Sequence, residues 1–159
     1  MSNSLFRLFS FGLDVSKSQE SSIEACLELF NQAENSIIIV SGELNDEFYG
    51  DKRTCNALRD AAERGVTLKI ACGPQVSSKM LTATRKLEKK YSNVKFYPLS
   101  ERPEPHFMVI DGKTIRAQLG HVAGTQEHRA VIRYDSPEVA ARFWDYLDNL
   151  LGKGAATPR

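Results

Sequence analysis

Cysteine is scarce in this chain of 159 residues, and its distribution argues against a disulfide-stabilised fold. The three cysteines, Cys26, Cys55 and Cys72, are far apart and form no Cys-x-x-Cys pair. An odd number of cysteines without a regular spacing does not indicate a disulfide framework. We therefore expect a protein of the reducing cytoplasm.

The chain also lacks a large net charge and a long apolar run. A formal net charge of +1 argues against a strongly cationic nucleic-acid binder, although a local patch can still bind. No apolar run approaches the roughly 20 residues that cross a bilayer. The apolar stretch at 5–11 is short, is interrupted by Arg7, and lacks the cleavage site of a secretory signal. We expect no membrane contact, and an N-terminal arm at 1–19 that packs on the core or on a second subunit.

Apart from the N-terminal arm, the chain has the length of one globular domain. Apolar residues make up 42% of the chain and charged residues 26%, which are ordinary values for such a domain. We place the domain at 20–152 and expect a disordered tail at 153–159, which is rich in small residues.

The hydrophobic pattern predicts alternating strands and helices, followed by strands in quick succession. Residues 36–40 read Ser-Ile-Ile-Ile-Val, a β-branched run without alternation, which is typical of a strand buried on both faces. The helices are expected at 20–34, 54–64, 78–91 and 136–152, and the strands at 36–40, 66–72, 94–97, 107–111, 114–118 and 129–134. This order predicts an α/β fold with a mixed, mostly parallel sheet and helices on both of its faces.

The segment at 104–113 carries the most specific pattern in the chain. It reads Glu-Pro-His-Phe-Met-Val-Ile-Asp-Gly-Lys and resembles the signature strand of the phospholipase D superfamily, His-x-Lys-x-x-x-x-Asp-Gly. Aligning Asp111 and its glycine puts His106 on the signature Lys and Glu104 on the signature His. The other register, with His106 on the signature His, would put Met108 on the Lys and Lys113 on the Asp. Either way the nucleophilic pair is not intact.

The resemblance extends over about 20–150. Residues 63–70 are similar to the family's Ala-x-x-Arg-Gly-Val strand entry, and 127–140 to its closing Glu-strand-Asp-Pro-x-Leu-Ala segment. The Gly-Ser-x-x-Asn element that follows the family signature is missing, and 118–121 occupies that region. Only one copy of the signature is present. Since single-copy members of this family pair, the resemblance implies a homodimer with 104–106 near the two-fold axis, weaker at high pH.

The resemblance implies a degenerate site. Family members use one His as the nucleophile, a second as the acid and Lys to hold the phosphate, so the changes at Glu104 and His106 favour a non-catalytic role. We interpret the domain as a ligand-binding, regulatory or assembly module for a phosphate-bearing ligand or a partner protein, without a cofactor. One alternative is a divergent phosphodiesterase or nuclease with Glu104 as nucleophile or base, His106 as acid and His121 on an oxyanion. Another is a metal site of His106, His121 and Glu127, whose spacing matches no familiar template.

Three further expectations concern individual side chains. The side chains of Glu104, His106, His121 and Glu127 should converge on one cleft, with Gln118 beside His106. Asp111 should be structural, because a carboxylate beside a tight turn binds backbone N–H groups. The basic helix at 79–95 offers a possible phosphate-contacting face for nucleic acid, through Lys86, Lys89 and Lys90.

Overall fold

The β-branched run at 36–40 forms the central strand, β2 (Ser36–Ser41), and both of its faces are buried. The computed structural model describes residues 14–16, 18–118 and 130–154 of the chain. In it, Ile37 and Ile39 face one core, Ile38 and Val40 face another, and each is at most 1% exposed. Since successive side chains of a strand point to opposite faces, the lack of alternation in the sequence reports two-sided burial.

Seven strands of the described residues form one sheet, in the order β1-β7-β6-β5-β2-β3-β4. Besides β2 they are β1 (Asp14–Ser16), β3 (Thr67–Cys72), β4 (Val94–Pro98), β5 (Phe107–Ile110), β6 (Thr114–Gln118) and β7 (Ala130–Arg133). The β2–β3 and β3–β4 pairs are parallel. The β2–β5, β5–β6, β6–β7 and β1–β7 pairs are antiparallel. The mixed sheet is confirmed, but its predicted predominance of parallel pairs is wrong, because β5 enters beside β2 in the opposite direction.

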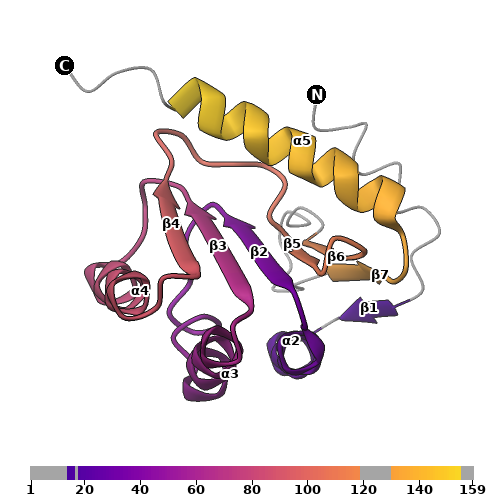
Figure 1. The fold of residues 1–159 in the computed structure, drawn as a ribbon, viewed down its shortest axis with the longest axis horizontal. Helices are drawn as coiled ribbons and strands as arrows, with labels where there is room; N and C mark the ends of the chain where they lie inside the picture. Colours follow the sequence, from indigo (N-terminus) through magenta and orange to yellow (C-terminus); the bar gives the residue numbers. More distant parts are fainter. Residues whose placement is uncertain (1–13, 17, 119–129, 155–159) are drawn as a thin grey trace.

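Helices cover both faces of this sheet, as predicted (Figure 1). The helices α2 (Gln19–Gln32), α3 (Lys52–Glu63) and α4 (Ser78–Lys90) lie on one face, and α5 (Pro137–Gly154) lies alone on the other. Phe30 of α2 and Phe143 of α5 are both 0% exposed and belong to the two separate cores. Truncating a buried Phe to Ala typically costs about 3–5 kcal/mol, so each core contributes strongly to stability.

Polar side chains begin the helices on the crowded face. Ser18 accepts from the N–H of Ser21 and forms a capping box at the start of α2, while Asp51 and Ser77 cap α3 and α4. At the other end of α3, Gly65 has a φ of +89°, a conformation that glycine adopts without steric cost. These caps begin α2 and α4 within a residue of the predicted starts and α3 two residues before it.

The predicted N-terminal arm contains a strand that the sequence pattern did not indicate. Residues Asp14–Ser16 form β1, which pairs antiparallel with β7 at the edge of the sheet. Residues 1–13 and 17 of the arm, and 155–159 of the expected tail, lie outside the described part. Helix α5 extends to Gly154, two residues past its predicted end, which is within the usual drift of helix boundaries. Among the described helices, none combines the length and the apolar character needed to cross a bilayer.

Candidate functional site

Two glycines allow the loop between β4 and β5 to pack onto the carboxyl ends of β2 and β3. Gly42 follows β2 and Gly73 follows β3. A methyl group at Gly42 would lie 2.5 Å from Nε2 of His106 and 2.8 Å from Nε of Arg102. One at Gly73 would lie 2.5 Å from the carbonyl oxygen of Gly42. The absence of side chains therefore lets Arg102 and His106 pack directly against the strand ends, where ligands of open α/β sheets commonly bind.

His106 lies at the end of this loop, immediately before β5, and is half-buried. Its carbonyl oxygen accepts the N–H of Gln118 at 2.9 Å, which joins it to β6. Burial lowers the pKa of His106, and the Arg102 guanidinium lowers it further, against the opposing influence of Gln118 and nearby carboxylates. The imidazole is therefore neutral at pH 7 and can donate or accept a hydrogen bond.

A cavity of about 200 Å³ lies beside His106 and Arg102. Its wall combines the first turn of α2, the loop after β2, and the strands β5, β6 and β7. The lining residues are Gln19, Ser22, Ser41, Glu43, Asn45, Phe48, Tyr49, Arg102, His106, Phe107, Met108, Arg116, Gln118 and Ala130. We call this space the site cavity. Its lining holds two guanidinium groups, one imidazole, the Glu43 carboxylate and several hydroxyl and amide groups. Because the two guanidinium groups outnumber the single carboxylate, the lining suits an anionic ligand.

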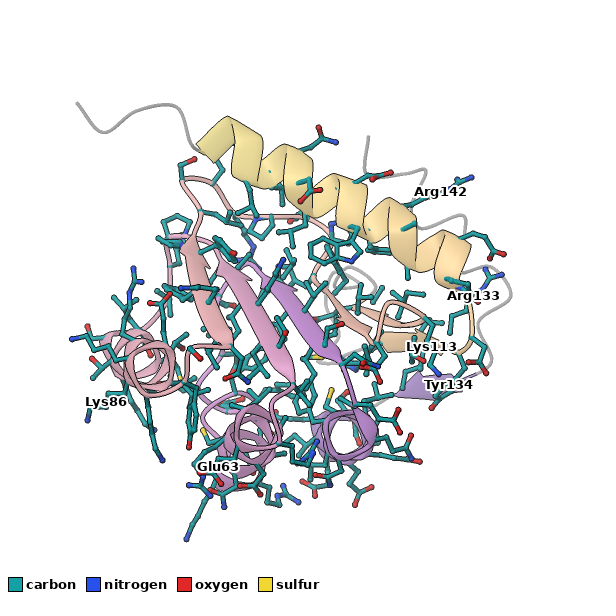
Figure 2. All side chains as sticks on the ribbon, viewed as in Figure 1. Glu63, Lys86, Lys113, Arg133, Tyr134 and Arg142 are labelled. Atoms are coloured by element: carbon teal, nitrogen blue, oxygen red, sulfur yellow. The ribbon has the colours of Figure 1, made fainter. Side chains whose placement is uncertain are left out.

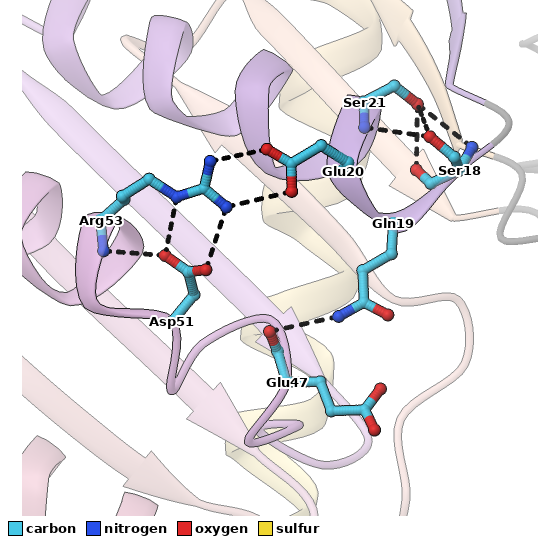
Figure 3. Close-up of polar contacts among 7 residues, drawn as sticks. All are labelled: Ser18, Gln19, Glu20, Ser21, Glu47, Asp51 and Arg53. Carbon is cyan, nitrogen blue, oxygen red and sulfur yellow. Dashed lines mark hydrogen bonds and ion pairs between the residues drawn. The ribbon is translucent and has the colours of Figure 1, made fainter.

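An arginine outside the cavity holds one of its walls in place (Figure 3). The Arg53 guanidinium donates to both carboxylate oxygens of Glu20, at 2.6 and 3.1 Å, and also to Asp51. It therefore joins the first turn of α2 to the start of α3. Beside it, Nε2 of Gln19 donates to the carbonyl oxygen of Glu47 at 3.3 Å. These contacts fix the loop that carries Phe48 and Tyr49 relative to α2.

The structure brings together only some of the residues expected at the site. His106 and Gln118 line the site cavity, whereas Glu104 is exposed and is absent from its lining. The backbone of Glu104 is bound instead to Tyr146 on α5, on the other face of the sheet. His121 and Glu127 lie outside the described residues.

Sequence reasoning missed Arg102, Arg116, Ser22 and Tyr49, all of which line the cavity. Arg116 lies on β6 and is only 8% exposed, with its Cζ atom 5.6 Å from the centre of the Phe48 ring. A signal for it was present in the sequence. Thr114, Arg116 and Gln118 alternate with apolar residues, and in a sheet covered on both faces such a polar row must point inward.

The carboxylate of Asp111 is bound by the protein backbone. Its carboxylate accepts the N–H groups of Glu34, Asn35 and Ser36 at 3.0, 2.7 and 2.8 Å. The partners belong to the connection between α2 and β2, and not to the hairpin turn itself. Because Ile110 pairs with Ile37, the carboxylate lies at the opposite end of β2 from Gly42 and the site cavity.

The basic residues of α4 form a separate region. Lys86 and Lys89 are exposed, and Lys86 points away from the sheet (Figure 2). Lys90 lies 3.6 Å from a carboxylate oxygen of Glu63, and Arg85 pairs with Glu88 at 2.8 Å. These pairs neutralise part of the helix, so its available positive charge is smaller than the sequence suggests.

The described residues contain no group of three or more His, Cys, Asp and Glu side chains placed to hold a metal ion. Of the three ligands in the metal hypothesis, only His106 belongs to this part of the chain.

Comparison with known proteins identifies the fold. No protein-family model matches the sequence, and no curated protein matches it. Among solved structures, Nuc from Salmonella typhimurium, a phospholipase D family member, superposes with a TM-score of 0.71 and 18% identity over 92% of this chain and 97% of its own. The phospholipase D-like fold expected from the sequence is therefore confirmed.

Two larger proteins share the fold. TrmBL2, an archaeal chromatin protein with a novel mode of DNA binding, gives a TM-score of 0.70 and 17% identity over 95% of this chain and 59% of its own. The chain thus spans about three fifths of that protein. Polyphosphate kinase from Porphyromonas gingivalis superposes with a TM-score of 0.61 and 11% identity, over all of this chain and 30% of its own. At these identities the likeness concerns fold alone, because one fold hosts many functions.

Proposed function

We propose that this phospholipase D-like domain is a binding module for a phosphate-bearing ligand and does not hydrolyse phosphodiesters. The observation that carries the proposal is the packing of Arg102 and His106 around Gly42 at the carboxyl ends of the parallel strands. A guanidinium donates two parallel hydrogen bonds to a phosphate, and the imidazole beside it adds a third donor. The Gln118 side chain, which lines the same cavity, completes a polar mouth for an oxyanion.

The position of Glu104 supports binding without turnover. In the register that keeps Asp111, Glu104 stands where the family has its nucleophilic His, yet its side chain is exposed and does not line the site cavity. A carboxylate there would also repel the phosphate it had to attack. Loss of a positioned acid or base typically costs about 10²–10⁴-fold in rate.

Calorimetric titration with inorganic phosphate tests the binding role. Arg102→Ala should weaken phosphate binding at least about tenfold, the usual scale for a charge-assisted contact. Arg142→Ala is the matched control, since Arg142 is exposed on α5 and does not line the cavity (Figure 2). Equal affinity in both variants would remove the proposed site. Measurable phosphodiester hydrolysis that Glu104→Gln abolishes would instead establish the divergent phosphodiesterase or nuclease.

A nucleic-acid-binding role is the second candidate. It is supported by the exposed Lys86 and Lys89 on α4, and by the DNA binding that is reported for the structurally similar TrmBL2. Each phosphate contact changes the slope of log affinity against log salt by about 0.9. Replacing both lysines with Gln should therefore reduce that slope by about 1.8 if they contact DNA. If the slope does not change when both lysines are replaced, these lysines do not contact DNA and this role is contradicted.

We infer a homodimer that keeps the 104–106 region near its two-fold axis. A twofold interface lets one surface meet itself. Two facing copies of Glu104 would repel unless His106 is protonated, so dimerisation should weaken as pH rises. Light scattering between pH 5.5 and 8.5 tests both parts. A monomer mass throughout would contradict the dimer, whereas a constant dimer mass would contradict only its pH dependence.

The proposed location is the cytoplasm. Cys26, Cys55 and Cys72 are all free thiols, and Cys26 and Cys72 are buried. Free cysteines without disulfides are the usual state in a reducing compartment. Cell fractionation that found the protein outside the cytoplasm would contradict this assignment.

A further inference from the structure

Arg116 is a buried cation that has no ion-pair partner among the described residues. The residue is 8% exposed, and its Nε atom has no hydrogen-bond partner. Within 18–118 and 130–154, no carboxylate oxygen lies within the 4.0 Å that would make an ion pair with it. An isolated buried charge is costly, and proteins retain one chiefly where it has a partner or a function.

Two titratable groups whose pKa the Arg116 charge lowers, Cys26 and Tyr49, supply no negative charge, and the Glu43 carboxylate in the same cavity lining makes no ion pair with Arg116. Burial raises the pKa of the Cys26 thiol to about 11 and raises that of the Tyr49 phenol well above its ordinary range. Both groups are therefore protonated and neutral at physiological pH. The Phe48 ring contributes a cation–π contact, which attracts the guanidinium but leaves its charge uncompensated.

A second unsatisfied group lies on the same cavity wall. Ser22, in the first turns of α2, is 2% exposed, and its Oγ atom has no hydrogen-bond partner. Ser22 and Arg116 both line the site cavity, whereas the third such residue among the described ones, Thr54, does not. The first turn of a helix also carries partial positive charge. Two unsatisfied polar groups and a helix N-terminus thus meet at one space.

We propose that Arg116 and Ser22 form an inner subsite for a second anionic group of the ligand, covered by the aromatic pair Phe48 and Tyr49. The ligand then carries one phosphate at the mouth, against Arg102 and His106, and a further carboxylate or phosphoryl group inside. This assignment deepens the proposed function and rests on it only for the outer group. A guanidinium recognises carboxylate and phosphate oxygens with the same paired N–H donors, so the shared chemistry is a planar or tetrahedral oxyanion.

The size of the site cavity limits the ligand to a small organic molecule. About 200 Å³ is less than the roughly 300–1,000 Å³ of sites for drug-sized ligands. Phe48, Tyr49 and Met108 contribute apolar surface to its lining. A short, doubly anionic compound with an apolar middle fits this distribution, whereas a nucleic-acid strand does not.

The experiment compares three probes on the full chain: inorganic phosphate for the mouth, benzoate for the inner subsite, and 4-carboxyphenyl phosphate for both. Melting temperature and calorimetric affinity are measured for the wild type, Arg116→Met and Arg102→Ala. Ligand-free Arg116→Met should melt above the wild type, because Met fills similar space without a buried charge. Arg116→Met should lose its response to benzoate and keep its response to phosphate. Arg102→Ala should lose its response to phosphate and keep its response to benzoate.

Two results would overturn the inner subsite. One is an Arg116→Met protein that melts below the wild type while benzoate stabilises both equally, because Arg116 would then be structural. The other comes from the unmodified protein: the ¹⁵N signal of Arg116 Nε–H should move on adding benzoate, and a fixed signal contradicts the proposal even if the variant fails to fold. If phosphate binding is lost only in Arg116→Met, the outer site fails and the inner one stands. If it is lost only in Arg102→Ala and the Arg116 signal stays fixed, the proposed function alone survives.

Discussion

The hydroxyl group of Tyr146 binds the backbone of Glu104 twice. It accepts the N–H of Glu104 at 3.2 Å and donates to the carbonyl oxygen of the same residue at 2.6 Å. This pair of bonds attaches the loop between β4 and β5 to α5. Since Arg102 and His106 flank Glu104 in that loop, a contact on one face of the sheet positions two side chains of the site cavity.

Tyr146→Phe removes both hydrogen bonds and keeps the ring, which packs edge-on against Phe107. We expect a loss of about 1–2 kcal/mol in the free energy of unfolding, and weaker phosphate binding because the loop gains freedom. Urea unfolding and calorimetry measure the two effects. Tyr97→Phe is the matched control, because the structure gives its hydroxyl group no hydrogen bond within the described residues. If both variants behave alike, the loop is held by something else.

Gly42→Ala tests whether the glycine is needed for close packing at the mouth. The added methyl group would meet His106 Nε2 at 2.5 Å and must displace that ring or Arg102. Overpacking of this kind typically costs about 1–3 kcal/mol, and phosphate affinity should fall at least about tenfold. Gly152→Ala is the control, since its methyl group would meet no atom within 4 Å. Unchanged phosphate affinity in Gly42→Ala would show that the mouth does not need this spacing.

Asp111→Asn should reduce stability in a pH-dependent way. Burial alone would raise the pKa of this carboxyl, but the N–H groups of Glu34, Ser36 and Asn35 outweigh it and hold the pKa below its ordinary value. Asn tolerates the positive φ of 52° at this position, so the substitution isolates the charge. Because the group is only partly buried, we expect a loss of about 1–2 kcal/mol near neutral pH.

The sign of the pH dependence follows from the depressed pKa of Asp111. Its contribution is fully present above the unfolded value of about 3.9 and is lost as pH falls through the lower folded value. Unfolding curves of the two proteins should therefore converge in acid. A difference that stays constant from pH 7 to pH 3 would contradict a role for the charge.

His106 should gain a proton when phosphate binds. Burial, with Arg102, keeps its pKa below the ordinary 6.5, and an anion at the mouth favours the imidazolium and raises it again. NMR titration of the ring should show this upward shift with phosphate, and affinity should increase as pH falls toward the raised pKa. Without ligand, the free energy of unfolding should instead decrease as pH falls, because the unfolded state binds the His106 proton at a higher pH than the folded state does. Wild-type stability should decline below about pH 6.5 more than that of His106→Gln.

The sequence predicted the described helices and six of the seven strands, because each carries a periodic or unbroken apolar pattern. The segment at 14–16 was not predicted as a strand, because three residues are too few to show a period and β1 exists through its pairing with β7. The antiparallel direction of β5 relative to β2 also could not be predicted from the local sequence pattern. Whether it joins β2 or another strand depends on tertiary contacts between residues far apart in the chain.

Of the residues that line the site cavity, the sequence singled out His106 and Gln118 but neither arginine. Arg102 lies in the loop between β4 and β5, whose path depends on Gly42 and Gly73. It belongs to no sequence motif that would have marked it as a site residue. Arg116 was not singled out, although helices expected on both faces of the sheet implied that a polar side chain on its strand points inward. The prediction for Glu104 rested on a register alone, and Tyr146, which holds its backbone on the other face, carries no recognisable pattern.

The place of β2 in the sheet has a consequence for synthesis on the ribosome. One of its edges pairs with β3, about 30 residues further along, but the other pairs with β5, about 70 residues further along. At translation rates of roughly 5–20 residues per second, that second edge waits on the order of ten seconds for its partner. During this interval the nascent chain presents an open strand of Ile37, Ile38, Ile39 and Val40. Such an edge invites pairing with other chains, so chaperone binding should be concentrated on this part of the nascent protein.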